Sequence, residues 1–387
     1  MSKFFFIESS VKGLIVKEER VGGGAAVQTL VWMNALKQQG HQVFLASFEN
    51  DNRELKDEYK NLELVNTYDT EKGIRWFRWV YYRYPKVFMA FKKLSPDYLY
   101  ESIPFWGSFM HSLFCKILGI THIIRISNDN LLDKRLMNTA SKTHQFFLFW
   151  GLRTCDIILS QNEYQYQTLK KKFPNKRILK IHNPIIIDKA LLASKSEHEK
   201  GYFAWLANFR FQKNLKLLHE IATLLPNEKF KVAGSPNKNI DEESSTYLQK
   251  LKELPNVEIL GPVRRDSLYS FLKNAKYLLN TSRYEGFSNT FLEAMVAGTP
   301  ILTTPAVNPD KIISKNNLGL IYETPEDLIT LLSSVNQERY AQLSQNCVDF
   351  VYTNHDHLNL ANRLMAYLDA PKTSDSEMVI SPKINNI

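Results

Sequence analysis

The stretch SRYEGFSNTFLEAMVAGTP, residues 282–300, decides the fold of this 387-residue chain. It joins an apolar run at 277–280 to another at 300–303 through a glycine-containing loop and a segment of helical periodicity that starts at about Thr290. Strand, helix and strand in this order predict a parallel βαβ unit. In sheets built from such units, ligands bind beyond the carboxyl ends of the strands, where residues 282–289 lie.

The same alternation of strands and helices runs through the rest of the chain. It reaches back to an apolar run at 3–7 and is interrupted by a polar segment at 188–200, which we interpret as an interdomain linker. The sequence therefore predicts an α/β protein of two tandem Rossmann-like, doubly wound domains with a cleft between them, residues 1–188 and 189–354. Residues 370–387 lack periodicity and are expected to form a flexible tail.

Composition excludes several classes of protein. Hydrophobic residues make up 44% and charged residues 23% of the chain, which is a globular balance. The three cysteines, Cys115, Cys155 and Cys347, form no C-x-x-C pair and indicate buried thiols in a reducing compartment. The N-terminus does not read as a signal peptide, and no apolar run approaches the roughly 20 residues of a membrane span. We expect a cytoplasmic protein, at most peripheral on the inner face of a membrane.

The charge of the chain favours anionic partners, since 49 Lys+Arg stand against 40 Asp+Glu, a formal +9. Residues 75–94, RWFRWVYYRYPKVFMAFKKL, hold six of these cations among many aromatic side chains. Three interpretations stay open: a membrane-surface element, a platform for single-stranded nucleic acid, or a helix pair whose aromatic side chains face the core. No RNA- or DNA-binding motif accompanies the segment, so we expect no nucleic-acid partner.

Two carboxylates in the deciding stretch are candidate ligands of a sugar nucleotide. Glu285 precedes a helix N-terminus, whose free N–H groups and positive dipole suit a diphosphate, and Glu293 is expected in the first turn of that helix. Both carboxylates also have interpretations that involve no ligand. Glu285 also suits a solvated loop, and Glu293 also suits a capping box with Thr290. Gly286 and Gly298 can be ordinary turn and C-cap residues.

The string E-G-F-x-x-x-x-x-E-A-M-x-x-G-x-P, residues 285–300, resembles the donor-site signature of the retaining glycosyltransferases of family 4, which have the GT-B fold and belong to glycosyl transferases group 1. The resemblance implies that Glu285 binds the donor sugar and that Glu293 binds the nucleotide ribose. It also implies that a run of donor-loop residues holds the sugar and the diphosphate, largely through backbone N–H groups: Gly286, Phe287, Ser288, Asn289 and Thr290.

A second block, Asn208-Phe-Arg210-Phe-Gln-Lys213, follows an apolar run at 202–207. Arg210 and Lys213 can converge on one phosphate, or they can be a solvated pair at a helix start. The block resembles the family's G-R-L-x-x-x-K-N segment, although Asn208 stands at the usual arginine position. The resemblance implies that Arg210 and Lys213 neutralise the leaving diphosphate, with Asn208 beside the donor.

Two shorter segments complete the expected donor site. VAGSP, which contains Gly234, and GPVRR, which contains Val263, resemble family segments that flank the nucleotide base. The sequence has no D-x-D pair and no histidine–cysteine cluster in a metal-binding context. Fixed cations and helix N–H groups can stabilise a leaving diphosphate without a metal. We therefore expect neither a metal nor another cofactor.

The N-terminal half contains candidates for an acceptor and diphosphate loop. Gly23 and Gly24 precede a helical pattern at 27–39 without the G-x-G-x-x-G spacing of a dinucleotide site. The family has a glycine-rich loop here, and a simple flexible loop is the alternative. The triplet Ser127-Asn128-Asp129 follows an apolar run; many family members have a histidine where this chain has Ser127. The resemblance also implies that a helix at about 355–369 packs back on the first domain.

The resemblance as a whole implies a retaining, metal-independent hexosyltransferase. It would move a sugar from a nucleoside-diphosphate sugar to a saccharide or lipid-linked glycan, in cell-surface polysaccharide or glycan synthesis. Two alternatives stay open. One is a GT-B nucleotide-sugar epimerase, and the other is a non-catalytic nucleotide-sugar-binding protein.

Overall fold

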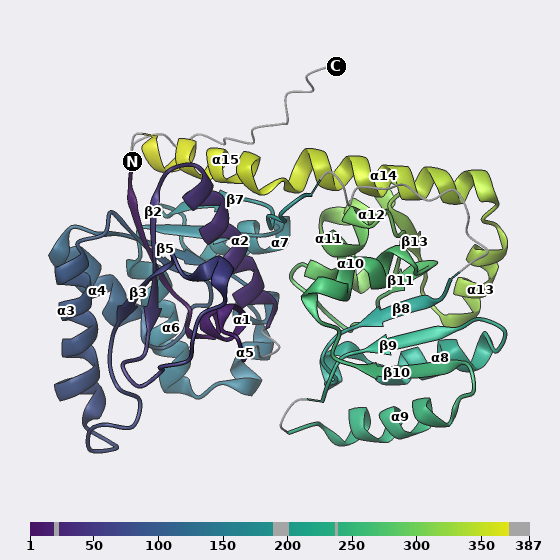
Figure 1. Ribbon diagram of the computed structural model, residues 1–387, viewed down its shortest axis with the longest axis horizontal. Coiled ribbons are helices and arrows are strands. Elements are labelled where there is room, and N and C mark those ends of the chain that lie inside the picture. Colours follow the sequence, from purple (N-terminus) through teal and green to yellow (C-terminus); the bar gives the residue numbers. More distant parts are fainter. Residues whose placement is uncertain (19–22, 189–200, 237–238, 371–387) are drawn as a thin grey trace. The chain divides into compact units, whose positions relative to one another are not determined.

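The computed structural model describes residues 1–18, 23–188, 201–236 and 239–370, which belong to two compact units (Figure 1). Unit 1 contains residues up to Pro184 together with those from His357 onward, and unit 2 runs from Ile185 to Asp356. Nearly all of the expected linker, 188–200, and of the expected tail, 370–387, lies outside the described residues.

Unit 1 is built on a seven-stranded parallel sheet with the strand order β3-β2-β1-β4-β5-β6-β7. The order reverses between β1 and β4, so the loops after these two strands flank the switch point of the sheet. The strands are β1 (Lys3–Ile7), β2 (Gln42–Ser47), β3 (Glu63–Asn66), β4 (Tyr98–Glu101), β5 (Thr121–Arg125), β6 (Ile157–Ser160) and β7 (Arg177–Lys180).

Helices cover both faces of this sheet because successive strand residues point to opposite sides. Phe4 and Phe6 of β1 face α2 (Gly24–Gln38) and α15 (His357–Asp369), whereas Phe5 faces α3 (Tyr84–Leu94) and α4 (Ser108–Leu118). The other helical elements of unit 1 are η1 (Ser9–Val11), α1 (Lys12–Ile15), η2 (Asp57–Tyr59), η3 (Trp79–Arg83), η4 (Asp129–Leu131), α5 (Lys134–Thr139), α6 (Lys142–Thr154) and α7 (Glu163–Lys172).

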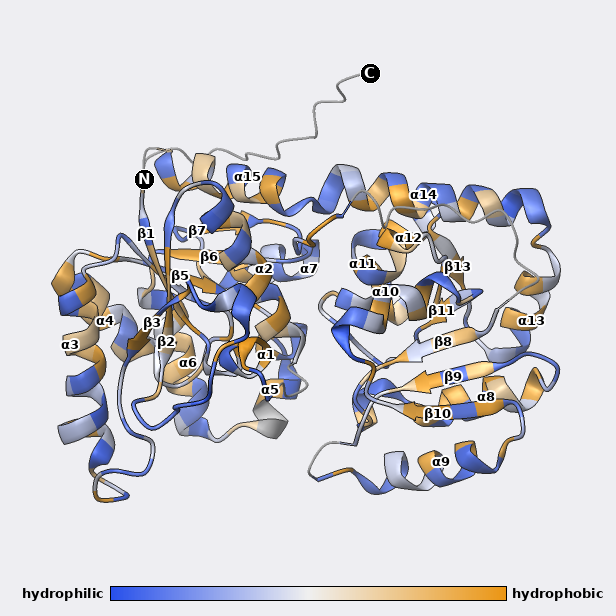
Figure 2. Ribbon diagram, viewed as in Figure 1, coloured by the Kyte–Doolittle hydropathy of each residue, from blue (hydrophilic) through white to orange (hydrophobic). Residues whose placement is uncertain are grey.

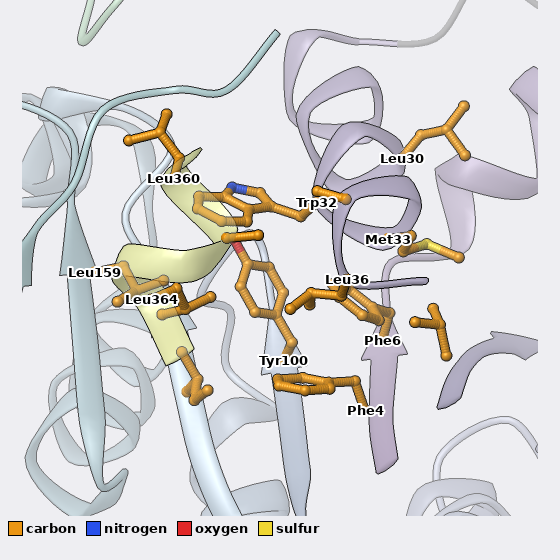
Figure 3. Packing of buried hydrophobic residues seen from close by; sticks show 14 of the residues in the cluster. Phe4, Phe6, Leu30, Trp32, Met33, Leu36, Tyr100, Leu159, Leu360 and Leu364 are labelled. Atoms are coloured by element: carbon orange, nitrogen blue, oxygen red, sulfur yellow. The ribbon is translucent and has the colours of Figure 1, made fainter. Parts of the chain in front are cut away.

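The core of unit 1 joins distant parts of the chain. Trp32 of α2 is fully buried and packs in one cluster with Tyr100 of β4 and with Leu360 and Leu364 of α15 (Figure 3). Helix α15 therefore belongs to unit 1, although it follows unit 2 in the sequence.

Unit 2 repeats the plan with six parallel strands in the order β10-β9-β8-β11-β12-β13. The strands are β8 (Phe203–Leu206), β9 (Phe230–Ala233), β10 (Val257–Gly261), β11 (Tyr277–Leu279), β12 (Ile301–Thr303) and β13 (Gly319–Ile321). The helical elements are η5 (Phe211–Lys213), α8 (Leu215–Leu224), α9 (Glu242–Glu253), α10 (Arg265–Lys273), α11 (Asn289–Val296), η6 (Pro305–Val307), η7 (Pro309–Lys311), α12 (Ile312–Lys315), α13 (Pro325–Ser333) and α14 (Gln337–His355). The order reverses between β8 and β11, and each of these strands leads into one of the two candidate blocks.

The two parallel sheets confirm the predicted α/β class with two Rossmann-like domains. The deciding stretch has the predicted form: β11 and β12 pair in parallel, and α11 connects them. Gly298 follows α11 with a φ of 62°, a conformation that glycine adopts without strain. All three cysteines are free and buried. None of the described helices combines the length and the apolar character that crossing a membrane requires.

Candidate donor site

Lys213 and Glu285 form an ion pair at the switch point of unit 2. Lys213 ends η5, the short helix after β8, and Glu285 lies in the loop after β11. Lys213 Nζ donates a hydrogen bond to Glu285 Oε1, and the two side chains are only 13% and 10% exposed. Ser282 Oγ donates to the same carboxylate oxygen at 2.9 Å. Two residues that the sequence placed in separate blocks, 72 positions apart, thus lie in direct contact.

Hydrogen bonds fasten the two loops to each other beneath this pair. Trp205 Nε1 donates to Thr281 Oγ1 at 2.9 Å, and Thr281 Oγ1 donates to the carbonyl of Lys213 at 2.8 Å. Gln212 Nε2 donates to the carbonyl of Tyr284 at 2.7 Å. Because these bonds fix the backbone on both sides of the ion pair, the positions of Lys213 and Glu285 are set before any ligand binds.

Arg210 differs from Lys213 in its environment. It precedes η5 in an extended conformation, and its side chain is exposed. Among the described residues, no hydrogen bond or ion pair holds its guanidinium. The two cations expected to converge on one phosphate thus differ in their surroundings. The Lys213 ammonium is paired with Glu285, whereas the Arg210 side chain is exposed to solvent. Asn208, at the usual arginine position, is half-buried.

Two expectations about Glu293 are wrong. Helix α11 begins at Asn289 with Ser288 as its N-cap, so Glu293 lies beyond the first turn, and the N-cap side chain makes no capping hydrogen bond. Asn289 and Thr290 already have helical backbone, so the helix starts earlier in the sequence than the predicted Thr290. Thr290 therefore cannot cap the helix, and its hydroxyl instead lies 2.8 Å from the Ser288 hydroxyl.

Glu293 is a buried carboxyl with a shifted pKa. Its side chain is 9% exposed, and burial raises its pKa to about 7. Arg265, the first residue of α10, opposes the shift from 3.8 Å and is itself 41% exposed. The carboxyl therefore stands between its charged and neutral forms near neutral pH, and hydrogen-bond donors from a ligand would favour the charged form.

The other donor-loop residues surround the start of α11. Gly286 lies between Glu285 and Phe287 in the loop. Phe287 is buried, with its ring centroid 5.4 Å from that of His355 in α14. This contact packs the loop against α14.

Gly234 is required by the backbone around it. It follows β9 with a φ of 152°, and a Cβ there would lie 1.8 Å from the carbonyl oxygen of Ala207, at the end of β8. Its N–H donates to the carbonyl of Gly261 at 2.8 Å, which ties the ends of β9 and β10 together. Val263 is half-buried and packs against the apolar cluster that contains α11.

The candidates in unit 1 have mostly structural contacts. Gly23 is the N-cap of α2, and a Cβ there would meet no atom within 4 Å, so the backbone does not demand glycine. Gly24 is the first residue of α2 rather than part of a loop, so the expected helix start at Val27 is three residues late. Ser127 is half-buried beyond the end of β5.

Asn128 and Asp129 hold the loop after β5. Asn128 Oδ1 accepts a hydrogen bond from the N–H of Asn130 at 3.3 Å, which caps η4. Asp129 Oδ1 accepts from Asn162 Nδ2 at 3.1 Å and from Gln165 Nε2 at 2.8 Å. Burial raises the pKa of Asp129 above its usual range. These bonds tie the loop to the N-terminus of α7, which is a structural role for Asp129.

The sequence did not single out three residues that the structure places beyond the carboxyl ends of strands. Ser282 contacts Glu285 from three positions earlier, and Arg265, at the start of α10, lies near Glu293. In unit 1, Glu8 Oε2 accepts a hydrogen bond from Ser102 Oγ at 2.7 Å, between the loops after β1 and β4. The strand order locates such residues, but local sequence does not. Within the described part of the chain, no three His, Cys, Asp or Glu side chains gather in a way that could hold a metal ion.

Comparison with known proteins gives consistent results. Residues 188–349 match the family described as glycosyl transferases group 1. An uncharacterized glycosyltransferase of Methanocaldococcus jannaschii is 23% identical over 299 residues, which is 76% of this chain and 81% of that protein. Anabaena HepE in complex with UDP-glucose has a TM-score of 0.74 at 13% identity, with 95% of this chain and 99% of that chain covered. Sucrose-phosphate synthase from Thermosynechococcus elongatus has a TM-score of 0.73 at 13% identity, with coverages of 95% and 98%.

Proposed function

Because this chain belongs to the GT-B glycosyltransferases of group 1, we propose that it moves a sugar from a nucleoside-diphosphate sugar to a saccharide or lipid-linked glycan. We further propose that the sugar keeps its anomeric configuration, as in family 4, and that the product is a cell-surface polysaccharide or glycan. The ion pair of Lys213 and Glu285 at the switch point carries the proposal. HepE binds UDP-glucose, which supports a UDP-sugar as the first donor to test.

The proposed chemistry begins at the bond between the anomeric carbon and the diphosphate. As this bond breaks, negative charge grows on the leaving phosphate oxygen. The Lys213 ammonium, fixed by its loop contacts, and the Arg210 guanidinium, in solvent among the described residues, would stabilise that charge. The acceptor hydroxyl oxygen bonds to the anomeric carbon from the same face, and its proton passes to the leaving diphosphate.

Glu285 would serve two purposes in this scheme. Its Oε1 already accepts from Lys213 and Ser282, which orients the carboxylate, and Oε2 remains for a donor sugar hydroxyl. Glu293 would accept hydrogen bonds from the ribose diol, and these bonds stabilise its charged form in a buried place. Since two side-chain cations, Lys213 and Arg210, would face the leaving group in this scheme, we also propose that transfer needs no divalent metal; addition of a chelator should leave the rate unchanged.

A panel of UDP-, GDP- and ADP-sugars tests the function. Ligand binding to the folded state alone must raise the melting temperature. Turnover is followed by release of nucleoside diphosphate, and the anomeric configuration of the product is read from its proton coupling by NMR. We expect Lys213→Ala and Glu285→Ala to abolish turnover.

The chain offers a matched control pair on the neighbouring helix. Lys216 and Glu220 in α8 are 3.9 Å apart but are 49% and 43% exposed, so Lys216→Ala and Glu220→Ala should leave turnover unchanged. Epimerisation of a donor without any acceptor would identify the epimerase alternative. Donor binding without turnover for any acceptor tried would identify the binding-protein alternative and contradict our proposal.

A further inference from the structure

Exposed apolar side chains concentrate in one part of unit 1. Among the described residues, 18 large hydrophobic side chains are exposed, and 11 of them lie within residues 74–149. Trp76 is 84% exposed and Phe77 is 67% exposed, in the segment that leads into η3 and α3. Further along the chain, Ile117 on α4 is 64% exposed and Phe146 on α6 is 56% exposed. Side chains of this size are normally buried, so their concentration in one region marks an interaction surface.

The basic–aromatic segment 75–94 divides into two sets. Phe88 and Phe91 pack their rings on Phe114 of α4, at centroid distances of 5.2 and 6.2 Å, so the core-facing interpretation holds for them. Trp76 and Phe77 remain outside this packing, as their exposure shows. Packing in the interior of unit 1 therefore accounts for only some of the aromatic side chains of residues 75–94.

The helices of this region are adjacent and carry no acidic residue. Ring contacts join α3 to α4 and, through Phe109 and Trp150 at 6.5 Å, α4 to α6. None of these three helices contains Asp or Glu. They contain six cations, Lys86, Lys92, Lys93, Lys116, Lys142 and Arg153, all exposed. Figure 2 shows hydrophilic and hydrophobic residues side by side along α3 and α4.

Most of the basic surplus of the chain lies in this region. Residues 74–154 contain 12 Lys+Arg and 4 Asp+Glu, a difference of +8, whereas the whole chain has +9. A surface that mixes exposed Trp, Phe and Ile with exposed lysines suits an interface in which cations meet anionic headgroups and apolar side chains enter the acyl boundary.

We propose that the surface formed by residues 74–81 and the outer sides of α3, α4 and α6 docks on an anionic lipid bilayer. The positive charge of this surface favours an anionic bilayer over a second copy of the chain. A second copy of the chain in a two-fold contact would bring the same positive charges together, which is unfavourable. The proposal stands apart from the transfer reaction, because docking requires no donor and uses other residues.

Vesicle co-sedimentation of the full chain, without any sugar nucleotide, tests the proposal. We expect binding to vesicles of phosphatidylcholine with phosphatidylglycerol, no binding to phosphatidylcholine alone, and release by salt. Neutralising two cations in Lys92→Gln/Lys93→Gln should weaken binding roughly 30-fold, since each cation near an anionic surface contributes about 1 kcal/mol. Trp76→Ala/Phe77→Ala should also weaken it, and Trp76→Phe should reduce the quenching of tryptophan fluorescence by brominated lipid.

Controls come from exposed residues of unit 2. Lys252→Gln/Lys315→Gln removes the same charge, and Leu224→Ser removes an exposed apolar side chain; neither should change vesicle binding. Three results would overturn the proposal: absence of binding to anionic vesicles, an equal loss in the control variants, or a dimer in sedimentation equilibrium that the Trp76→Ala/Phe77→Ala variant abolishes. Binding of the same residues to single-stranded RNA in place of vesicles would overturn it as well.

Discussion

The buried carboxyl of Glu293 makes the stability of unit 2 depend on pH. In the unfolded chain this group has a pKa near its usual 4.5, and in the folded protein burial raises the pKa to about 7. The folded state therefore holds a proton that the unfolded state releases. The protonated carboxyl therefore contributes to the free energy of unfolding in full below pH 4.5, and this contribution is lost as the pH rises through 7.

The size of the effect follows from the shift. One pKa unit corresponds to 1.36 kcal/mol, so a shift from 4.5 to about 7 costs about 3 kcal/mol of unfolding free energy between acid and neutral pH. Glu293→Gln replaces the carboxyl with an uncharged group of similar shape. We expect the variant to equal the natural protein in stability near pH 4.5 and to exceed it by up to about 3 kcal/mol at pH 8. Its affinity for a sugar nucleotide should fall, because an amide is a weaker acceptor for the ribose diol than a carboxylate.

Trp205 allows the unfolding of unit 2 to be followed separately from that of unit 1. It is the only tryptophan in residues 185–387, and it is buried in unit 2. Fluorine NMR of fluorotryptophan-labelled protein in urea gives its unfolding midpoint at each pH. Glu253→Gln on α9 removes an exposed glutamate of the same unit and serves as the control. Parallel pH profiles for the natural protein and Glu293→Gln would refute the reasoning.

Three further predictions concern the same unit. Lys213→Ala and Glu285→Ala should each cost about 3 kcal/mol, since each strands a mostly buried charge, whereas the double variant should lose less than the sum in a double-mutant cycle from urea unfolding. Gly234→Ala should destabilise unit 2 by more than about 4 kcal/mol, because its Cβ would lie 1.8 Å from the Ala207 oxygen; an unchanged Trp205 midpoint would contradict this. Arg210→Ala should leave the midpoint unchanged, because its side chain is in solvent, while lowering affinity for nucleoside diphosphate in calorimetry.

The sequence predicted the fold because parallel βαβ units leave a strong local pattern. Buried strands such as β1 and β6 are continuous apolar runs, and helices between them are amphipathic. The helix starts were less predictable. Ser288 rather than Thr290 precedes α11, since both can cap a helix and only tertiary packing decides between them.

The candidate site, like the fold, was predicted only in part from the sequence. The motif placed Lys213 and Glu285 at one site, and the structure brings them into contact. It could not indicate that Glu293 is buried with a pKa near neutrality, because desolvation depends on the residues around α11 rather than on neighbours in sequence. Likewise, local sequence could not indicate that Asp129 accepts hydrogen bonds from Asn162 and Gln165, 33 and 36 positions away, at the start of α7.

The position of α15 has a consequence for synthesis on the ribosome. In terms of chain order, unit 2 is a domain inserted into unit 1, because the last helix of unit 1 emerges only after residue 356. Until then Trp32 lacks Leu360 and Leu364, so the apolar face of the nascent N-terminal sheet is covered only in part, by α2. Unit 2 is contiguous in the chain and can complete its fold first, so a helix translated after unit 2 completes the unit that was translated before it.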